Sequence, residues 1–255
     1  MPGYCAGIVT FNPNHDRLKM CIDSISSQVD KVFVKDNTAD NIGLAKALNQ
    51  LCEQAISEGY EWILTLDQDT IIPDGMIESF IPYTDEVKNA IICPSVYYEG
   101  WDKHQKTHGE IEYVKGCMTS GSFTRLSAWK EVGGFRDDFF IDYVDNEFCM
   151  KLMIKDYRVL RVNSCEMIHR LGNSAPGRKF PSHTTQRLYY MARNNYVFIR
   201  EYKEYLPVMK ERIKLSLLLW QELIHTDDRL EALKYVRRGI ADAKKGIMGR
   251  DSFGE

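Results

Sequence analysis

The chain contains 255 residues, of which 44% are hydrophobic, and it carries a formal net charge of −3. A chain of this size and composition forms one large globular domain, or one domain with a helical annex. The acidic balance argues against a general nucleic-acid-binding protein, so we expect no nucleic-acid partner.

The charge is uneven along the chain, because residues 184–255 carry +4 and the remainder carries −7. The basic tail is either a set of solvated helix faces or a contact surface for an anionic membrane or an anionic acceptor. The apolar run at 215–220 is too short to span a bilayer. The N-terminal segment lacks the basic start and long apolar core of a signal peptide. We therefore predict a cytoplasmic protein, and leave peripheral contact with the inner face of the membrane open.

The first 100 residues alternate between predicted strands and predicted helices. The strands are at 5–11, 31–37, 62–66 and 90–96, and the helices begin near 16, cover 41–59 and cover 75–82. This order indicates an α/β fold with a Rossmann-like, mostly parallel sheet flanked by helices. After residue 184 the pattern is helical, so we predict one domain over 1–183 and a C-terminal helical extension over 184–255. Its two or three helices would pack on the core or on a partner.

The seven cysteines are odd in number, and none belongs to a CxxC motif. Most of them have apolar neighbours. This pattern is typical of buried free thiols in a reducing compartment, and not of a disulfide framework or a zinc site.

Polar side chains follow the first three predicted strands. Thr10 ends the first strand, Asp36 and Asn37 end the second, and Asp67 and Asp69 follow the third. Parallel sheets bind ligands at the carboxyl ends of their strands, so we expect these side chains to line one site. Burying a lone carboxylate is costly, so we expect two acids at the end of a buried strand to be compensated by a binding partner.

Three kinds of nucleotide site fit this type of fold. The chain lacks the GxxxxGK[ST] motif of a P-loop, and the turn at 10–16 has none of the glycines of a GxGxxG motif. The third kind binds phosphates through a divalent cation. On an extended chain, Asp67 and Asp69 would point to the same side and suit Mg²⁺ or Mn²⁺. The alternative is a solvated turn, which Asp favours.

Five segments together carry a family resemblance. They are VTFNPN at 9–14, VKDNTADNIGLAKALNQ at 34–50, LTLDQDT at 64–70, GSFTRLSAWKEVGGFRDDFFIDYVDNEFCMKL at 121–152 and HRLG at 169–172. In this order and spacing they resemble family 2 glycosyltransferases with the GT-A fold, near the rhamnosyltransferase-like and galactofuranosyltransferase-like branch. The resemblance extends from about residue 4 to about residue 200.

The resemblance implies an inverting transferase that uses a divalent metal and a dTDP- or UDP-linked sugar donor. The sugar would be rhamnose or another deoxyhexose or hexose, and the acceptor a surface polysaccharide or a lipid-linked glycan. Thr10 would line the nucleotide pocket, Asp36 would contact the base, and Asn37 would lie beside it. Asp67 would lie near the ribose and diphosphate, and Asp69 would be the direct metal ligand.

His169 would be the second metal ligand by the same resemblance. Neutral imidazole is a common metal ligand, and this histidine follows a predicted strand. The alternative is a structural histidine with its hydrogen bonds satisfied inside the protein.

Asp145 would occupy the position of the catalytic base, which deprotonates the acceptor hydroxyl. Asp142 and Glu147 are the other candidates in the same segment, and either could also contact the acceptor. Val144 replaces an acid that is common in the family, which makes the register of the motif less secure. The alternative is that Asp142 or Asp145 caps the following helix.

Several further residues have weaker sequence signals. Trp101 lies in a polar stretch and is a candidate for stacking on an acceptor sugar. Arg170, Arg178 and Lys179 are candidates for binding phosphate. We expect Trp62, Trp129, Tyr189 and Tyr190 in the core. Two rival functions stay open, a non-catalytic sugar-nucleotide-binding protein and a nucleotidyltransferase, and a homo-oligomer is also open.

Overall fold

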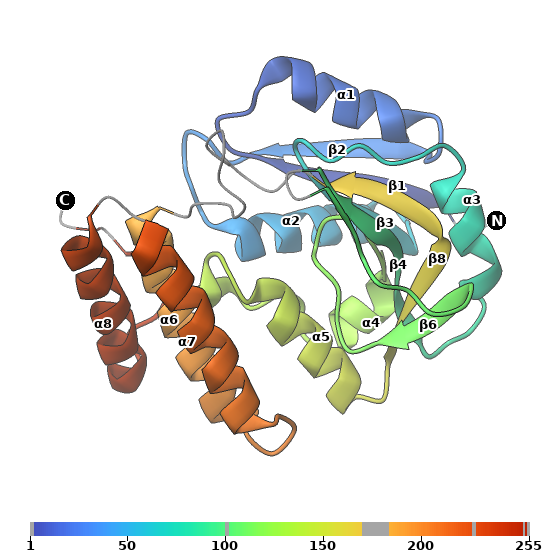
Figure 1. The fold of residues 1–255 in the computed structure, drawn as a ribbon. Coiled ribbons are helices and arrows are strands. Elements are labelled where there is room, and N and C mark those ends of the chain that lie inside the picture. The colour runs from blue at the N-terminus through green and yellow to red at the C-terminus, as the bar shows by residue number, and fades with distance from the viewer. Residues whose placement is uncertain (1–2, 100–101, 170–183, 226–227, 252, 254–255) are drawn as a thin grey trace.

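The computed structural model describes residues 3–99, 102–169, 184–225, 228–251 and 253, and it contains one mixed sheet and a group of C-terminal helices (Figure 1). In chain order the elements are β1 (Tyr4–Thr10), α1 (His15–Ser26), β2 (Lys31–Asp36), α2 (Leu44–Ser57), β3 (Trp62–Asp67), α3 (Met76–Phe80), a 3-10 turn (Ile81–Tyr83), β4 (Asn89–Tyr98), β5 (Lys103–His104), β6 (Ile111–Val114), β7 (Ser122–Arg125), α4 (Leu126–Glu131), a second 3-10 turn (Asp137–Phe139), α5 (Val144–Ile154), β8 (Arg158–His169), α6 (Thr185–Glu201), α7 (Val208–His225) and α8 (Arg229–Lys245).

The sheet has the strand order β2-β1-β3-β7-β4-β8-β6, with β5 paired to β4. Strands β1, β2, β3, β4 and β8 run in one direction, and the short strands β5, β6 and β7 run in the opposite one. The predicted α/β fold with a mostly parallel sheet is therefore confirmed. The sequence pattern missed the three reversed strands, because each has four residues or fewer.

Helices cover both faces of the sheet, as predicted (Figure 1). Successive residues of β3 point to opposite faces, so that Ile63 joins one apolar core and Leu64 the other. Helices α1 and α3 contribute Ile25 and Met76 to the core of Leu64, whereas α2 and α5 contribute Leu51 and Phe148 to the core of Ile63. The central parallel strands β1, β3 and β4 are therefore largely buried on both sides, whereas the edge strand β2 is mostly exposed or half-buried.

The C-terminal helices pack against this core and against one another. Val197 and Phe198 of α6 belong to the same apolar cluster as Phe148 of α5. On its other side α6 packs closely on α8, where a Cβ at Gly239 would collide with the carbonyl oxygen of Tyr189. The described residues after 184 thus form three helices, of which α6 packs on the core and α7 packs on α6 and α8. The division into a domain over 1–183 and an extension over 184–255 stays a prediction.

The other core predictions are confirmed. All seven cysteines are free and six of them are buried. The residues expected in the core are buried: Trp62, Trp129, Tyr189 and Tyr190. In the part of the chain that the structure describes, no helix is both long enough and apolar enough to cross a bilayer.

Candidate active site

The carboxyl ends of β1, β2 and β3 lie side by side and bring the first predicted residues together. The parallel register aligns Thr10 with Asp36 and aligns Val9 with Asp67. Thr10 is buried, and its side chain helps to lower the pKa of Asp36. The convergence expected from the strand pattern is therefore present at one edge of the sheet.

Asp36 and Asn37 have different surroundings although they are neighbours. Asp36 is exposed, and hydrogen bonds from Thr38 lower the pKa of its carboxyl group. Its Oδ1 accepts the Thr38 N–H at 2.9 Å. Asn37 is buried, its N–H donates to the carbonyl of Thr10, and its Oδ1 accepts the Ile42 N–H at 3.0 Å. Asp36 is therefore available to a ligand, whereas Asn37 shapes the following loop.

The Asp67-Gln68-Asp69 segment is a turn and does not continue the strand. Strand β3 ends at Asp67, and the N–H of Thr70 donates to the carbonyl of Asp67 at 3.1 Å. The expectation that Asp67 and Asp69 lie on an extended chain and point to the same side for that reason is therefore wrong. The side chain of Gln68 accepts from and donates to the backbone of Phe11, which fixes the turn against the end of β1.

The two acids of this turn nevertheless interact electrostatically. Burial raises the pKa of Asp67, and the nearby charge of Asp69 raises it further. His169 and Arg187 act in the opposite direction on the same carboxyl group. Asp67 thus lies near one further acid, Asp69, and two basic groups, His169 and Arg187, which come from three separate segments of the chain. A cation bound between the carboxylates would relieve their repulsion.

An antiparallel bridge brings His169 to this turn. Ile71 pairs with Ile168, and the N–H of Ile168 donates to the carbonyl of Ile71 at 3.3 Å. The next residue, His169, is buried at the end of β8. The bridge therefore holds this histidine against the segment that carries both acids.

Hydroxyl groups connect the turn to His169. The hydroxyl of Ser120 accepts the N–H of Asp67 at 2.9 Å and lies 2.8 Å from the hydroxyl of Thr70. The Thr70 hydroxyl lies 3.5 Å from Nδ1 of His169. Contacts of this kind orient a metal-binding imidazole through its second nitrogen. They leave Nε2 of His169 for a ligand.

The described residues include no group of three or more His, Cys, Asp or Glu side chains that could hold a metal ion. Asp69 and His169 alone form an incomplete set. Mg²⁺ and Mn²⁺ are commonly held by one or two protein side chains together with phosphates of the substrate. The pair therefore fits a cation that arrives with a diphosphate.

The loop before α5 is strained and is held from α6. Phe140, Asp142 and Tyr143 all have φ near +64°, which costs non-glycine residues roughly 1–3 kcal/mol each. The guanidinium of Arg193 donates to the carbonyls of Asp138 and Phe139.

The next residue of α6 completes this contact. The amide of Asn194 donates to the carbonyls of Phe139, Ile141 and Asp142 at 2.8–2.9 Å. Arg193 and Asn194 are both completely buried. We call these two residues the α6 clamp, because together they hold backbone that would otherwise relax.

Asp142 forms an ion pair with Arg187 in the first turn of α6. Nε and Nη2 of Arg187 both donate to the carboxylate, at 2.9–3.1 Å. This two-pronged geometry is among the stronger side-chain contacts in proteins. The carboxylate of Asp142 is thus occupied by Arg187, and the guanidinium of Arg187 also lies within electrostatic reach of Asp67.

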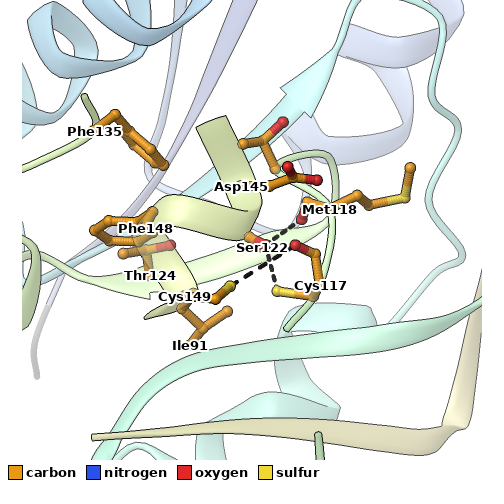
Figure 2. Close-up of a pocket in the computed structure, with 10 residues that line it drawn as sticks. Ile91, Cys117, Met118, Ser122, Thr124, Phe135, Asp145, Phe148 and Cys149 are labelled. Atoms are coloured by element: carbon orange, nitrogen blue, oxygen red, sulfur yellow. Dashed lines mark hydrogen bonds between the residues drawn. The ribbon is translucent and has the colours of Figure 1, made fainter. Parts of the chain in front are cut away.

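Asp145 lies in the first turn of α5, and burial raises its pKa to about 6. The charges of Asp142 and Asp67 raise this pKa as well, so the carboxylate is within electrostatic reach of both. Figure 2 shows Asp145 at the side of a small pocket. The pocket is lined by Ile91, Cys117, Met118, Thr119, Ser122, Thr124, Phe135, Phe148 and Cys149.

Neither Asp142 nor Asp145 caps helix α5 with its side chain. The N-cap residue is Tyr143, in a left-handed conformation and without a side-chain hydrogen bond. The predicted capping by Asp142 or Asp145 is therefore wrong. Asp142 is turned to Arg187, and Asp145 accepts the N–H of its neighbour Asn146 at 2.8 Å.

The structure does not bring Glu147 to the other candidates. Glu147 is two residues after Asp145 and so points to another side of α5. It is buried, accepts the hydroxyl of Tyr202 at 2.8 Å and pairs with Lys151. These contacts give it a structural place between α5 and α6, in contrast to the predicted acceptor contact.

Four weaker candidates lie outside the described residues: Trp101, Arg170, Arg178 and Lys179. The structure also brings three residues to the site that the sequence pattern did not single out: Arg187, Ser120 and Gln68. The sequence pattern assigned no role to these three residues, because each role depends on a partner 45 or more residues away.

A comparison with protein families matches residues 6–152 to the model described as glycosyl transferase family 2. The match covers more than half of the chain. It includes the carboxyl ends of β1, β2 and β3 and also Asp145. The chain belongs to glycosyl transferase family 2. The family resemblance is thereby confirmed, and four of its five segments lie within the matched range, whereas HRLG at 169–172 lies outside it.

A relative matches this transferase over nearly its full length. It is the dTDP-rhamnosyl transferase RfbF of Shigella flexneri, 25% identical over an alignment of 284 positions that covers 96% of this chain and 95% of that protein. This similarity supports the rhamnosyltransferase-like branch.

Solved structures share the fold. TarS 1–349 of S. aureus in complex with UDP-GlcNAc has a TM-score of 0.59 at 14% identity, covering 97% of this chain and 82% of that one. GalNAc-T7 with UDP, GalNAc and Mn²⁺ has a TM-score of 0.58 at 12% identity, covering 97% of this chain and 56% of that one. The transferase therefore has the GT-A fold.

The raised pKa of Asp145 predicts a stability cost at neutral pH. The folded state keeps the proton up to about pH 6, whereas the unfolded state loses it near the ordinary value of 3.8. Stability is therefore lost as the pH rises through this window, by up to about 3 kcal/mol. We expect Asp145→Asn to be roughly 1–3 kcal/mol more stable than the wild type at pH 7, and equal to it near pH 4.

Urea unfolding across this pH range measures the difference. Asp74→Asn, which changes an exposed acid outside the site, is the control and should follow the wild type. Equal stability of Asp145→Asn and wild type at every pH would contradict the proposed environment of Asp145.

Proposed function

We propose that this transferase is inverting and metal-dependent, and that it moves a sugar, with rhamnose the first candidate, from a nucleotide diphosphate. The acceptor is a surface polysaccharide or a lipid-linked glycan. The observation that carries the proposal is the meeting of Asp67 with Asp69, His169 and Asp145 at one edge of the sheet. Asp67, Asp69 and His169 would bind the donor and its metal ion, and Asp145 would act as the base.

Asp145 is the proposed base. With a pKa of about 6, it is ionised at neutral pH and still basic enough to accept a proton. It takes the proton of the acceptor hydroxyl while the oxygen attacks the anomeric carbon. The bond from that carbon to the diphosphate oxygen breaks on the opposite face, and the configuration inverts. The proton then passes from Asp145 to water, and no covalent enzyme intermediate is needed.

Asp69 and His169 are the proposed metal ligands, with Mn²⁺ or Mg²⁺ as the ion. When bound, the ion neutralises the diphosphate and makes it a better leaving group. Thr70 and Ser120 support this role by orienting the imidazole of His169. Asp67 feels the charges of His169, Asp69 and Arg187, and it would contact the ribose and diphosphate.

The donor base would lie over the ends of β1 and β2. Thr10 lines this place, Asn37 shapes the loop beside it, and Asp36 is exposed and ionised there. Uracil and thymine both present an N–H that a carboxylate can accept. This supports UDP- or dTDP-linked donors, and the rhamnosyl transferase relative, whose name specifies dTDP, favours the second.

We place the transferase in the cytoplasm, with a catalytic domain over 1–183 and its helical extension over 184–255. Two alternatives remain as outcomes of the tests below. A non-catalytic sugar-nucleotide-binding protein would bind the donor without transfer. A nucleotidyltransferase would form a new nucleotide–phosphate bond.

Asp145→Asn tests the proposed base. The substitution removes the proton acceptor and keeps the shape of the side chain, so transfer should fall by a factor of 10² or more, as for loss of a general base. Donor binding should stay within about twofold of the wild type. Transfer is measured with a panel of dTDP- and UDP-sugars. Turnover near that of the wild type would refute the assignment, and donor binding without transfer by the wild type would favour the binding-protein alternative.

Asp69→Ala tests the metal ligand. Loss of the carboxylate should abolish the part of donor affinity that depends on Mn²⁺, and leave metal-free binding unchanged. Titration calorimetry with and without Mn²⁺ separates the two parts. Asp74→Ala, five residues later and exposed, is the matched control. A donor affinity that responds to Mn²⁺ equally in wild type and Asp69→Ala would exclude this ligand.

A further inference from the structure

Helix α7 carries a continuous apolar stripe on its exposed side. Its residues have 48–71% of their surface exposed and are Met209, Ile213, Leu217, Trp220 and Ile224. Their spacings of four, four, three and four residues place them on one helix face. We call this set the α7 stripe. Single exposed apolar residues are common, but a row along a whole helix marks an interaction surface.

The opposite side of α7 already has its packing partners. Leu219 is buried and belongs to an apolar cluster with Leu188 of α6 and Val236 of α8. Leu215 packs against the same cluster. The α7 stripe is therefore additional to the residues that attach the helix to the protein.

Basic side chains border the α7 stripe on both flanks. Lys210 and Lys214 follow Met209 and Ile213 by one position, and Arg212 precedes Ile213 on the other flank. All three cations are exposed. Glu211 points to the packed side and is only 18% exposed, where its carboxylate pairs with Lys214 at 2.9 Å.

We propose that the α7 stripe binds the surface of an anionic lipid bilayer. The apolar side chains would enter the boundary between head groups and acyl chains, while the bordering cations would contact anionic head groups. Trp220 suits this position, because its ring is amphipathic. The charged residues of α7 keep the helix parallel to the membrane plane. A second copy of the chain would instead bring the same cations face to face.

This orientation would also bring the bilayer close to the catalytic edge. Leu219 contacts the cluster of Leu188, and Leu188 follows Arg187, the partner of Asp142. The C-terminal half of the α7 stripe therefore lies at the active-site end of α6. This second step rests on the proposed function: a lipid-linked acceptor in the same bilayer would reach Asp145 without leaving the membrane.

Vesicle co-sedimentation of the full chain tests the binding step without donor or activity. We expect the wild type to bind phosphatidylglycerol vesicles, to bind pure phosphatidylcholine vesicles at least about tenfold more weakly, and to dissociate at high salt. Leu217→Gln with Trp220→Gln should reduce partitioning by at least about tenfold. Lys210→Gln with Arg212→Gln should remove most of the preference for anionic lipid.

Val87→Gln with Tyr113→Gln is the matched control, since it removes two exposed apolar side chains far from α7 in the sequence. All variants change exposed residues, and unchanged thermal unfolding shows that they fold. The proposal is overturned if the wild type fails to bind phosphatidylglycerol vesicles, or if the stripe variant binds as the wild type does. It is also overturned if sedimentation shows a dimer that the stripe variant dissociates.

Discussion

The candidate site depends on the hydrogen bonds by which the α6 clamp holds the loop before α5. Arg193 and Asn194 are buried side chains, and their donors end on backbone carbonyls of residues 138–142. Without these bonds, the three non-glycine residues with positive φ would relax to less strained backbone conformations. The loop sets where α5 begins, and so where Asp145 lies. The α6 clamp, which belongs to a C-terminal helix, therefore fixes the position of Asp145.

Much of this site was predictable because its signals are local. Apolar runs predicted the strands, and the polar residue at each strand end followed from the direction of a parallel sheet. Asp67 and Asp69 were predicted in this way, whereas Asp145 was predicted from the family resemblance. Their precise surroundings were not, since the turn at 67–70 and the engagement of Asp142 depend on tertiary contacts.

The rest of the site depends on contacts between distant segments. The bridge from Ile71 to Ile168 and the ion pair from Arg187 to Asp142 join residues 97 and 45 positions apart. No pattern within a window of ten or twenty residues contains such partners. The run ARNN at 192–195 is an example, because the structure buries these polar residues and two of them form the α6 clamp.

The central claim is that burial and neighbouring acids give Asp145 the pKa of a base at neutral pH. The pH dependence of kcat/KM for the donor tests it most directly, because this ratio reports the ionisation of groups in the free enzyme. The account predicts that activity falls on the acid side with an apparent pKa of about 6. Activity that persists down to the ordinary carboxyl value of 3.8 would contradict it.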